Sequence, residues 1–225
     1  MSSLTRSTTS FLQSSIGRKI IVAVTGLVLV GFLAGHLVGN LLIFTGREAF
    51  NEYAEFLHSV GHGAGIWVAR ISLLGAVALH IYFTIKLTLE NKAARPKYAY
   101  DATIQAPKNS RMMAISGLTI LSFIIFHLLH FTVRTDAELS AVGAIDPWQM
   151  VIIGFQNIWV VIFYLISMGL LCSHLGHGFS SIFQTLGIST EKTRPFFQKV
   201  GTAYAWIIFL GFISIPVSIY FGLVG

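Results

Sequence analysis

Charged residues are scarce in this sequence. Asp, Glu, Lys and Arg together make up 11% of its 225 residues, whereas hydrophobic residues make up 54%. A typical soluble domain carries about 25% charged residues, so this composition excludes an ordinary soluble protein. The sequence also lacks a glycine-rich phosphate loop, a dinucleotide-binding fingerprint and a nucleophilic triad. No connection is long enough for a soluble catalytic domain, so we expect chemistry on a water-soluble substrate to occur on a partner, and we expect no nucleic-acid partner.

Five long apolar segments are present instead. Each is near or above the roughly 20 residues that a helix needs to cross a bilayer, and each is continuously apolar, which is typical of spanning helices rather than of barrel strands. Only the second contains charges, Arg70 and Lys86. The sequence therefore predicts an all-α integral membrane protein, a single domain over 1–225 with five transmembrane helices. The expected spans are 20–44, 66–89, 112–133, 150–175 and 203–224.

Lysine and arginine are distributed unevenly between the connections, and these residues favour the cytoplasmic side. The N-terminal arm and the second and fourth connections are basic, whereas the first and third are mostly acidic. We therefore expect the N-terminus in the cytoplasm and the C-terminus outside. The arm lacks a short apolar core followed by a cleavage site, so we expect the first helix to be retained. The basic residues are Arg6, Arg18, Lys19, Lys92, Arg95, Lys97, Lys108, Arg111, Lys192, Arg194 and Lys199.

Four of the eight histidines lie one apiece in four of the apolar segments: His36, His80, His127 and His174. A polar group in hydrocarbon is costly unless it has a partner, so each predicts a bound group. From the helical rise, His36 lies about 26 Å beyond Lys19 and His127 about 24 Å beyond Arg111, near the outer surface. His80 lies about 9 Å before Lys86, and His174 some 39 Å from Trp148, toward the cytoplasm. Two ligand pairs at two depths predict two stacked bis-histidine haems.

Other interpretations of these histidines stay open. His130 and His177 each follow a proposed ligand by three residues and so lie near the same helical face. The rise disfavours His130, which lies about 4.5 Å further outward than His127, but it does not decide between His174 and His177. The paired H-x-x-H pattern could hold a non-haem metal, although no buried carboxylate accompanies it. A hydrogen-bonded packing role is the alternative for each residue, and it is the interpretation we adopt for His62.

Three further features bear on a haem. Gly31, Gly35 and Gly39 form a smooth stripe that would admit a porphyrin or, equally, a neighbouring helix. Arg70 lies about 15 Å outward of His80 by helical rise, at the level of the outer pair, where a haem propionate could pair with it; extension to the outer interface is the alternative. Cys172 is the single cysteine, so no C-x-x-C-H motif exists and any haem is b-type.

The sequence around these histidines resembles a known family, the cytochrome b membrane anchors of succinate dehydrogenase and fumarate reductase, and more narrowly the single-chain, five-helix, dihaem cytochrome b558 type. The resemblance covers essentially the whole chain. It implies a haem-binding four-helix bundle plus one extra helix, with His36 and His127 as ligands of the outer haem b and His80 and His174 as ligands of the inner one. The matching runs, in order, are GHLVGNLL, LHIYFTIKL, SGLTILSFIIFHLL and HLGHGFSSIFQTLGI.

The resemblance also implies partners in a bacterial cytoplasmic membrane. These are a flavoprotein containing FAD and an iron–sulfur protein on the cytoplasmic face, with electrons passing through both haems to a quinone, expected to be menaquinone. Some relatives place an acidic residue near an outer quinone site, where this chain has His58, with Glu55 one turn earlier. Either could exchange protons with quinone, or both could be ordinary solvated loop residues. A second quinone site near Ser15 and Arg18 stays open.

Two other functions remain compatible with the sequence. A dihaem cytochrome b that serves a hydrogenase or formate dehydrogenase would use the same histidine arrangement, and its copurifying partners would distinguish it. A haem-free membrane anchor or transport-type bundle would be colourless when purified, whereas a b-type cytochrome is red.

Overall fold

The structure, a computed structural model, describes residues 11–93 and 108–225. Regular structure in these ranges is entirely helical, which confirms the predicted all-α class. Arg6, Arg95 and Lys97, three of the basic residues used to predict orientation, lie outside the described residues. The described elements are α2 (Ser15–Leu41), η1 (Leu42–Thr45), α3 (Arg47–Ser59), α4 (Ala64–Ala93), α5 (Lys108–His127), the π-helical η2 (Leu128–Val133), α6 (Ala137–Val142), α7 (Pro147–Gly154), α8 (Ile158–Thr185) and α9 (Arg194–Tyr220).

Five of these helical stretches are long and apolar enough to span a membrane, as predicted. They are α2 with η1, α4, α5 with η2, α8 and α9. Several begin earlier than their apolar runs, since a helix can extend beyond the bilayer into polar sequence. The first starts at Ser15, where the Ser14 hydroxyl accepts a hydrogen bond from the Gly17 amide, and the last starts at Arg194 with a proline in its first turn.

The fourth span differs most from its expected bounds of 150–175. Met150 belongs to the short helix α7, the chain leaves helical geometry at Phe155, and α8 begins only at Ile158. The Asn157 side chain accepts a hydrogen bond from the Trp159 amide and so caps the new helix. Because both sides of the break are apolar, hydropathy alone could not locate it, and the membrane helix is shifted toward the sequence end by about two turns.

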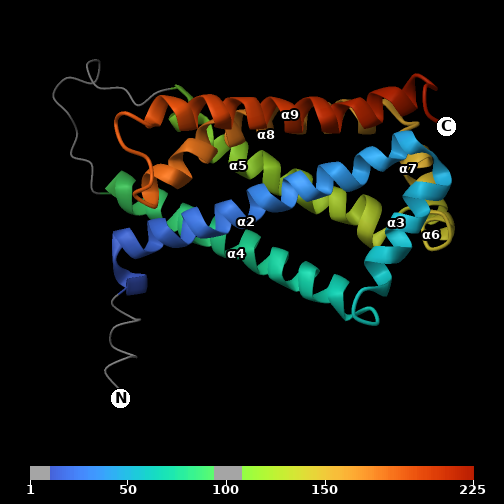
Figure 1. Cartoon of the computed structure of the whole chain (residues 1–225), viewed down its shortest axis with the longest axis horizontal. Helices are drawn as coiled ribbons and strands as arrows, with labels where there is room; N and C mark the ends of the chain where they lie inside the picture. The colour runs from blue at the N-terminus through green and yellow to red at the C-terminus, as the bar shows by residue number, and fades with distance from the viewer. Residues whose placement is uncertain (1–10, 94–107) are drawn as a thin grey trace.

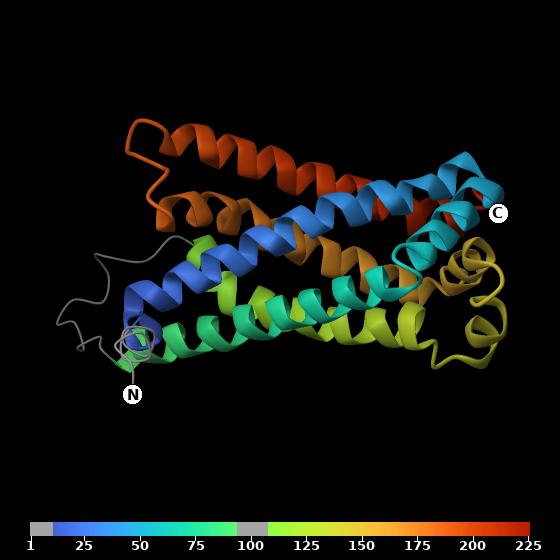
Figure 2. The ribbon, with the colours of Figure 1, turned by 60° about the horizontal axis from the view of Figure 1, so that its bottom comes forward.

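The bundle is built around α2 and α8. Helix α8 packs against α9, α5 and α2, while α2 also contacts α4 and α9. Figures 1 and 2 show α2 running obliquely across the molecule between α4 and α9. The main contacts of α4 are with α2 and α3, and the main contact of α5 is with α8, so both helices lie at the periphery of the bundle. Leu37 of α2 meets Met168, Leu171 and Ile208 from α8 and α9 in one buried cluster.

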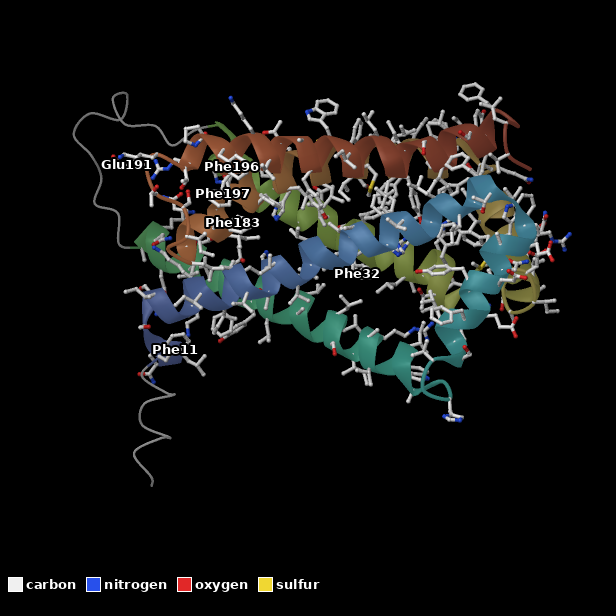
Figure 3. All side chains as sticks on the ribbon, viewed as in Figure 1. Phe11, Phe32, Phe183, Glu191, Phe196 and Phe197 are labelled. Atoms are coloured by element: carbon white, nitrogen blue, oxygen red, sulfur yellow. The ribbon has the colours of Figure 1, made fainter. Side chains whose placement is uncertain are left out.

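The two ends of the bundle differ in sequence and in structure. One end, here called the basic end, carries the start of α2 and the α8–α9 connection with Lys192, Arg194 and Lys199. Phe183 and Phe197 stack there with ring centroids 4.5 Å apart (Figure 3). The other, here called the capped end, carries α3, α6 and α7 and the C-terminus (Figure 1). The start of α2 and the C-terminus therefore lie at opposite ends, in agreement with an odd number of spans.

Candidate haem-ligand sites

The four membrane histidines fall at two levels of the bundle. His80 and His174 each lie 16 residues after the first residue of their helices (80 − 64 and 174 − 158), which is about 24 Å of rise from the capped end. The predicted 39 Å separation of His174 from Trp148 was wrong, because the chain between them is not one continuous helix. The two residues are nonetheless at matched depth, and the shorter helix makes the match closer than the sequence predicted.

His36 and His127 come together near the capped end. Their ring centroids are 5.9 Å apart and their planes are nearly perpendicular, at 82°. Two imidazole nitrogens that bind one metal ion from opposite sides lie about 4 Å apart, twice a metal–nitrogen bond of roughly 2.0–2.1 Å. The ring centres of such a pair lie somewhat further apart than the nitrogens. The separation of these two rings is thus on the scale of a shared iron.

Aromatic rings surround this pair. Phe32 stacks on His36 with centroids 5.1 Å apart, Phe123 stacks on His127 at 5.6 Å, and Phe212 of α9 lies 5.7 Å from His36. The Asn40 amide donates to the His36 carbonyl at 2.7 Å and lies 3.3 and 3.5 Å from its two ring nitrogens. Because the amide is close to both nitrogens, it covers the ring without favouring either one.

His127 is also held through a phenol. The Tyr164 hydroxyl of α8 lies 3.1 Å from the Nδ1 atoms of both His127 and His130. His127 ends α5, and the chain then continues as a π-helix that contains His130. Single π-helical turns inside membrane helices often mark functional sites. This widened turn lets two histidines three residues apart reach one hydroxyl group.

His80 on α4 points toward α2. Its Nδ1 lies 3.1 Å from the Thr25 hydroxyl and 3.2 Å from the Val22 carbonyl oxygen. Gly26 permits this approach, since a Cβ atom placed there would lie 3.3 Å from His80 Cε1 and 3.4 Å from Cδ1 of Ile182 on α8. A glycine at this position therefore allows α4 and α8 to meet the same turn of α2.

His174 on α8 makes the corresponding contact with α5. Its Nδ1 lies 3.2 Å from the hydroxyl of Ser116, which is 2% exposed. The neighbouring Gly117 again leaves room for the ring, because a Cβ atom there would lie 3.7 Å from His174 Cε1. The basic-end pair is thus positioned by hydroxyl groups, whereas the capped-end pair lies among aromatic rings.

The donor set fits haem b. An imidazole whose Nδ1 is hydrogen-bonded presents Nε2 to a metal, and His80, His127 and His174 are all arranged this way. In the described ranges no group of three or more His, Cys, Asp or Glu is placed to hold a bare metal ion. Gly31 and Gly35 have open space beside them. Thr84 Oγ1, one turn beyond His80, is buried with no partner among the described residues.

The other predicted residues lie further from the pairs. Arg70 is half-buried and its guanidinium lies 5.2 Å from the centre of the Trp67 ring. Glu55 and His58 are exposed on α3, and His58 Nδ1 lies 2.8 Å from the Ala54 carbonyl oxygen. His62 is exposed in the α3–α4 turn with a positive φ of 55°.

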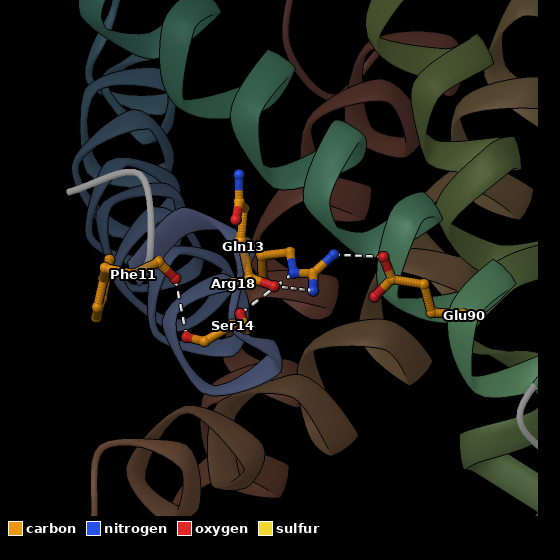
Figure 4. Close-up of polar contacts among 5 residues, drawn as sticks. All are labelled: Phe11, Gln13, Ser14, Arg18 and Glu90. Atoms are coloured by element: carbon orange, nitrogen blue, oxygen red, sulfur yellow. Dashed lines mark hydrogen bonds and ion pairs between the residues drawn. The ribbon is translucent and has the colours of Figure 1, made fainter. Parts of the chain in front are cut away.

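Ser15 and Arg18 lie at the basic end. Ser15 is exposed, whereas Arg18 is buried and forms an ion pair with Glu90 of α4 (Figure 4). Arg18 also donates to the carbonyl oxygens of Gln13 and Ser14. These contacts satisfy most of the guanidinium and tie the start of α2 to the end of α4. Arg18 is therefore a link between helices in this structure.

A buried carboxylate holds the capped end together. Asp146, which is 6% exposed, accepts hydrogen bonds from the Asn51 side chain at 2.8 Å and the Gln149 amide at 3.1 Å, and it pairs with Arg47 at 2.5 Å. Burial alone would raise the pKa of this carboxyl, but the hydrogen bonds from Asn51 and Gln149 and the nearby Arg47 outweigh it and hold the pKa below its usual value. Asp146 thus joins α3 to α7 in its ionised form.

Comparison with known proteins supplies a distant relative. The chain is 25% identical over 188 residues to the succinate dehydrogenase cytochrome b558 subunit of Bacillus subtilis (strain 168), and the match covers 82% of this chain and 85% of the relative. The resemblance to the cytochrome b558 family is confirmed. No protein-family model and no solved structure matches the chain.

Sequence reasoning missed the side chains that contact the histidines. Ser116 opens one of the runs that carried the cytochrome b558 resemblance, but Thr25 and Tyr164 lie outside all of them. A hydroxyl group in an apolar helix is a weak indicator, because it can bond to its own backbone. These three residues could have been found only from their depth in the membrane, because each lies at the level of a histidine on another helix. Comparing those levels requires the helix packing to be known.

Proposed function

We propose that this chain is the dihaem cytochrome b subunit that anchors a succinate:quinone oxidoreductase to the membrane. His36 and His127 would ligate one haem b near the capped end, and His80 and His174 a second near the basic end. The observation that carries the proposal is the placement of four membrane histidines at two levels, with three Nδ1 atoms hydrogen-bonded to neighbouring helices. The similarity to a succinate dehydrogenase cytochrome b558 subunit supports it.

The residues around each pair suit electron transfer. Haem b, when bound, supplies a one-electron iron couple. The imidazoles of each pair would hold the iron, and rings such as Phe32, Phe123 and Phe212 pack around the capped-end pair. Arg70 on α4 is the proposed partner of a propionate of that haem, in place of its present contact with Trp67.

We further propose that the basic end faces the cytoplasm and docks an iron–sulfur protein, which in turn carries an FAD-containing flavoprotein. Lys19, Lys192, Arg194 and Lys199 are exposed there, and basic residues favour the cytoplasmic side. The same charges favour an acidic partner surface. The N-terminus would then lie in the cytoplasm and the C-terminus outside a bacterial cytoplasmic membrane.

The experiment that tests the proposal is a reduced-minus-oxidised spectrum of the purified chain with haem counted per polypeptide. We expect two low-spin haems b. A count of one or zero would contradict the dihaem assignment, and copurification with a hydrogenase or formate dehydrogenase would redirect the proposal to that enzyme. Copurification with a flavoprotein and an iron–sulfur protein would support it.

Quinone, expected to be menaquinone, is proposed to react at the capped end, near the exposed Glu55 and His58. Electrons would then cross the membrane, and the transmembrane potential would act on the reaction at about 2.3 kcal/mol per charge per 100 mV. A site near Ser15 and Arg18 would move little charge. Succinate:quinone turnover in oriented proteoliposomes separates the two. Turnover indifferent to potential, with normal activity in a Glu55→Gln, His58→Ala double variant, would rule out the capped-end site.

A further inference from the structure

The two histidines of the basic-end pair make the same kind of contact with different helices. His80 of α4 meets Thr25 of α2, and His174 of α8 meets Ser116 of α5, in each case through Nδ1. Thr25 and Ser116 are 8% and 2% exposed. The two hydroxyl groups are therefore shielded from water, and their hydrogen-bonding capacity is used within the protein.

The Thr25 hydroxyl is committed as a donor to its own helix. Its Oγ1 lies 2.7 Å from the Ile21 carbonyl oxygen and 3.1 Å from that of Val22, and a carbonyl can only accept. With its single proton used there, Oγ1 can only accept from His80 Nδ1. The Val22 carbonyl, 3.2 Å from the same nitrogen, imposes the same direction. His80 is thereby held with its proton on Nδ1.

Ser116 repeats this arrangement. Its Oγ lies 3.2 Å from the Met113 carbonyl oxygen, to which it can only donate, and 3.2 Å from His174 Nδ1. When Nε2 of His174 binds a metal, the neutral ring carries its proton on Nδ1, and the hydroxyl oxygen would then accept that proton while donating to Met113. In both residues the remaining ring nitrogen, Nε2, keeps its lone pair free for a metal, and the ring is oriented by a helix other than its own.

We propose that Thr25 and Ser116 are positioning residues for the basic-end haem, each fixing the tautomer of one of the histidines that would hold it and increasing the electron donation of that histidine to the iron. This inference rests on the haem ligation proposed above. A more strongly donating imidazole stabilises the oxidised iron, so the two hydroxyls lower the midpoint potential of this haem. The capped-end haem has no part in these contacts.

The two positions differ in one respect that ranks their effects. His80 keeps the Val22 carbonyl as a second acceptor if Thr25 loses its hydroxyl, whereas Ser116 is the acceptor that the structure gives for His174 Nδ1. Removal of the Ser116 hydroxyl leaves the Nδ1 proton without that partner. Ser116→Ala therefore changes the midpoint potential of this haem more than Thr25→Val does.

The test uses the full-length, haem-loaded protein. Ser116→Ala and Thr25→Val are compared with two controls, Ser122→Ala on α5 and Thr88→Val on α4, whose exposed hydroxyls bond to their own helices and not to a histidine. The readouts are haem per chain, a redox titration that resolves the two haems, and the electron paramagnetic resonance signal of each oxidised haem. A purely structural role would alter stability without moving one potential selectively.

We expect one haem of the two to rise in midpoint potential, with a shifted resonance signal, more in Ser116→Ala than in Thr25→Val, and no change in the controls. Thr25→Ser, which restores a hydroxyl, returns the wild-type potential. If Ser116→Ala loses a haem, the Thr25→Val and Thr25→Ser pair decides the outcome in its place. Unchanged potentials in haem-replete variants would overturn this inference and leave the proposed function intact, whereas a wild-type chain without haem would overturn the proposed function.

Discussion

The two histidine pairs occupy contrasting surroundings in one bundle. At the capped end, His36 and His127 lie 5.9 Å apart among phenylalanine rings, and a tyrosine is shared between His127 and His130. At the basic end, His80 and His174 are each held by an aliphatic hydroxyl from a neighbouring helix. At the capped end one ligand, His127, is held by a phenol and the other, His36, mainly by packing, whereas at the basic end both ligands are held by aliphatic hydroxyls.

Because of this contrast, we expect the two pairs to respond to different changes in their surroundings. Stacked rings fix the position of an imidazole but leave its electron donation little altered, whereas a hydrogen bond at Nδ1 fixes the tautomer and increases the donation of Nε2. If both pairs bind haem, a hydrogen bond at Nδ1 tunes both ligands at the basic end but only His127 at the capped end, where His36 is surrounded mainly by aromatic rings. Two haems of different potential follow from one repeated ligand set.

We expect the largest effect on haem content from replacing the histidines of the two pairs. Replacing His80 or His174 by Ala removes the basic-end haem, and replacing His36 or His127 removes the other, because one axial ligand is lost in each case. Haem per chain falls from two to one. His62→Ala, in an exposed turn, keeps both haems, and so do His130→Ala and His177→Ala. Loss of a haem from any of these three controls would transfer the ligand role to that residue.

A change at Gly26 disturbs the basic-end pair alone. A Cβ atom there already lies 3.3 Å from His80 Cε1, and the extra methyl groups of Gly26→Val push the ring away from α2. We expect the content of one haem to fall severalfold, while the other is retained. Gly176→Ala on α8, whose added Cβ would lie 3.9 Å from Ala205 Cβ, provides the matched control with two haems. Equal loss of both haems in Gly26→Val would show that the two sites are not independent.

Removal of the Tyr164 hydroxyl tests how far a hydrogen bond supports the capped-end site. Tyr164→Phe keeps the ring that packs against His127 and removes the hydrogen bond to Nδ1. We expect about a tenfold loss of affinity for the capped-end haem, the low end of what such supporting contacts contribute, measured by haem titration of the apoprotein. Tyr204→Phe is the control, since its hydroxyl donates to the Val30 carbonyl oxygen and not to a histidine. An unchanged affinity in Tyr164→Phe would assign this site to packing alone.

Each ion pair joins one buried side chain to a more exposed partner. The side chains of Arg18 and Asp146 are both 8% exposed, whereas those of their partners Glu90 and Arg47 are 41% and 66% exposed. Glu90→Ala and Arg47→Ala each leave a buried charge without its ion-pair partner, but Arg47 is the more solvated of the two partners, so we expect Glu90→Ala to lower thermal stability more. Thermal unfolding in one detergent at fixed pH measures both. A greater loss in Arg47→Ala would reverse the ranking of the two ends.

The smallest expected effect is a pH dependence at the capped end. The pKa of Asp146 is lower in the folded protein than its usual value, so its contribution to stability is present above the ordinary carboxyl pKa of about 3.9 and is lost as the pH falls through the lower, folded-state value. Asp146→Asn removes this part of the acid sensitivity. Thermal unfolding from pH 6 down to pH 3 compares the variant with wild type, and parallel curves would exclude the carboxylate as a source.

Much of this architecture could be predicted from the sequence because each prediction rested on a local property. Apolar length predicted five spans, and one histidine in each of four spans predicted the two levels. The break at Phe155 could not be predicted, since both flanking segments are apolar and only the Asn157 cap separates them. Arg18 was named from the sequence as part of an alternative quinone site, which stays open. Its partner Glu90 lies 72 positions away in the sequence, so only helix packing shows that the two are paired.

The contacts of the histidines were beyond prediction for the same reason. Thr25, Ser116 and Tyr164 act across helix interfaces, and their roles depend on relative depth and rotation to within one residue. Periodicity gives a helix its faces, but it does not give the face that a distant helix presents at a given level. Hydroxyl groups in membrane helices also bond to their own backbone, as Thr25 and Ser116 both do, so their sequence pattern is the same with or without a histidine nearby.

The order of the contacts along the chain has a consequence for biosynthesis. The two histidine pairs interleave, since His80 lies between His36 and His127, and His127 lies before His174. A chain that enters the membrane from its N-terminus has both capped-end histidines once α5 is inserted, but Tyr164, which contacts His127, arrives only with α8. The same helix delivers His174. Insertion of α8 therefore completes both sites in one event, and a chain truncated before Ile158 holds three of the four histidines with neither site complete.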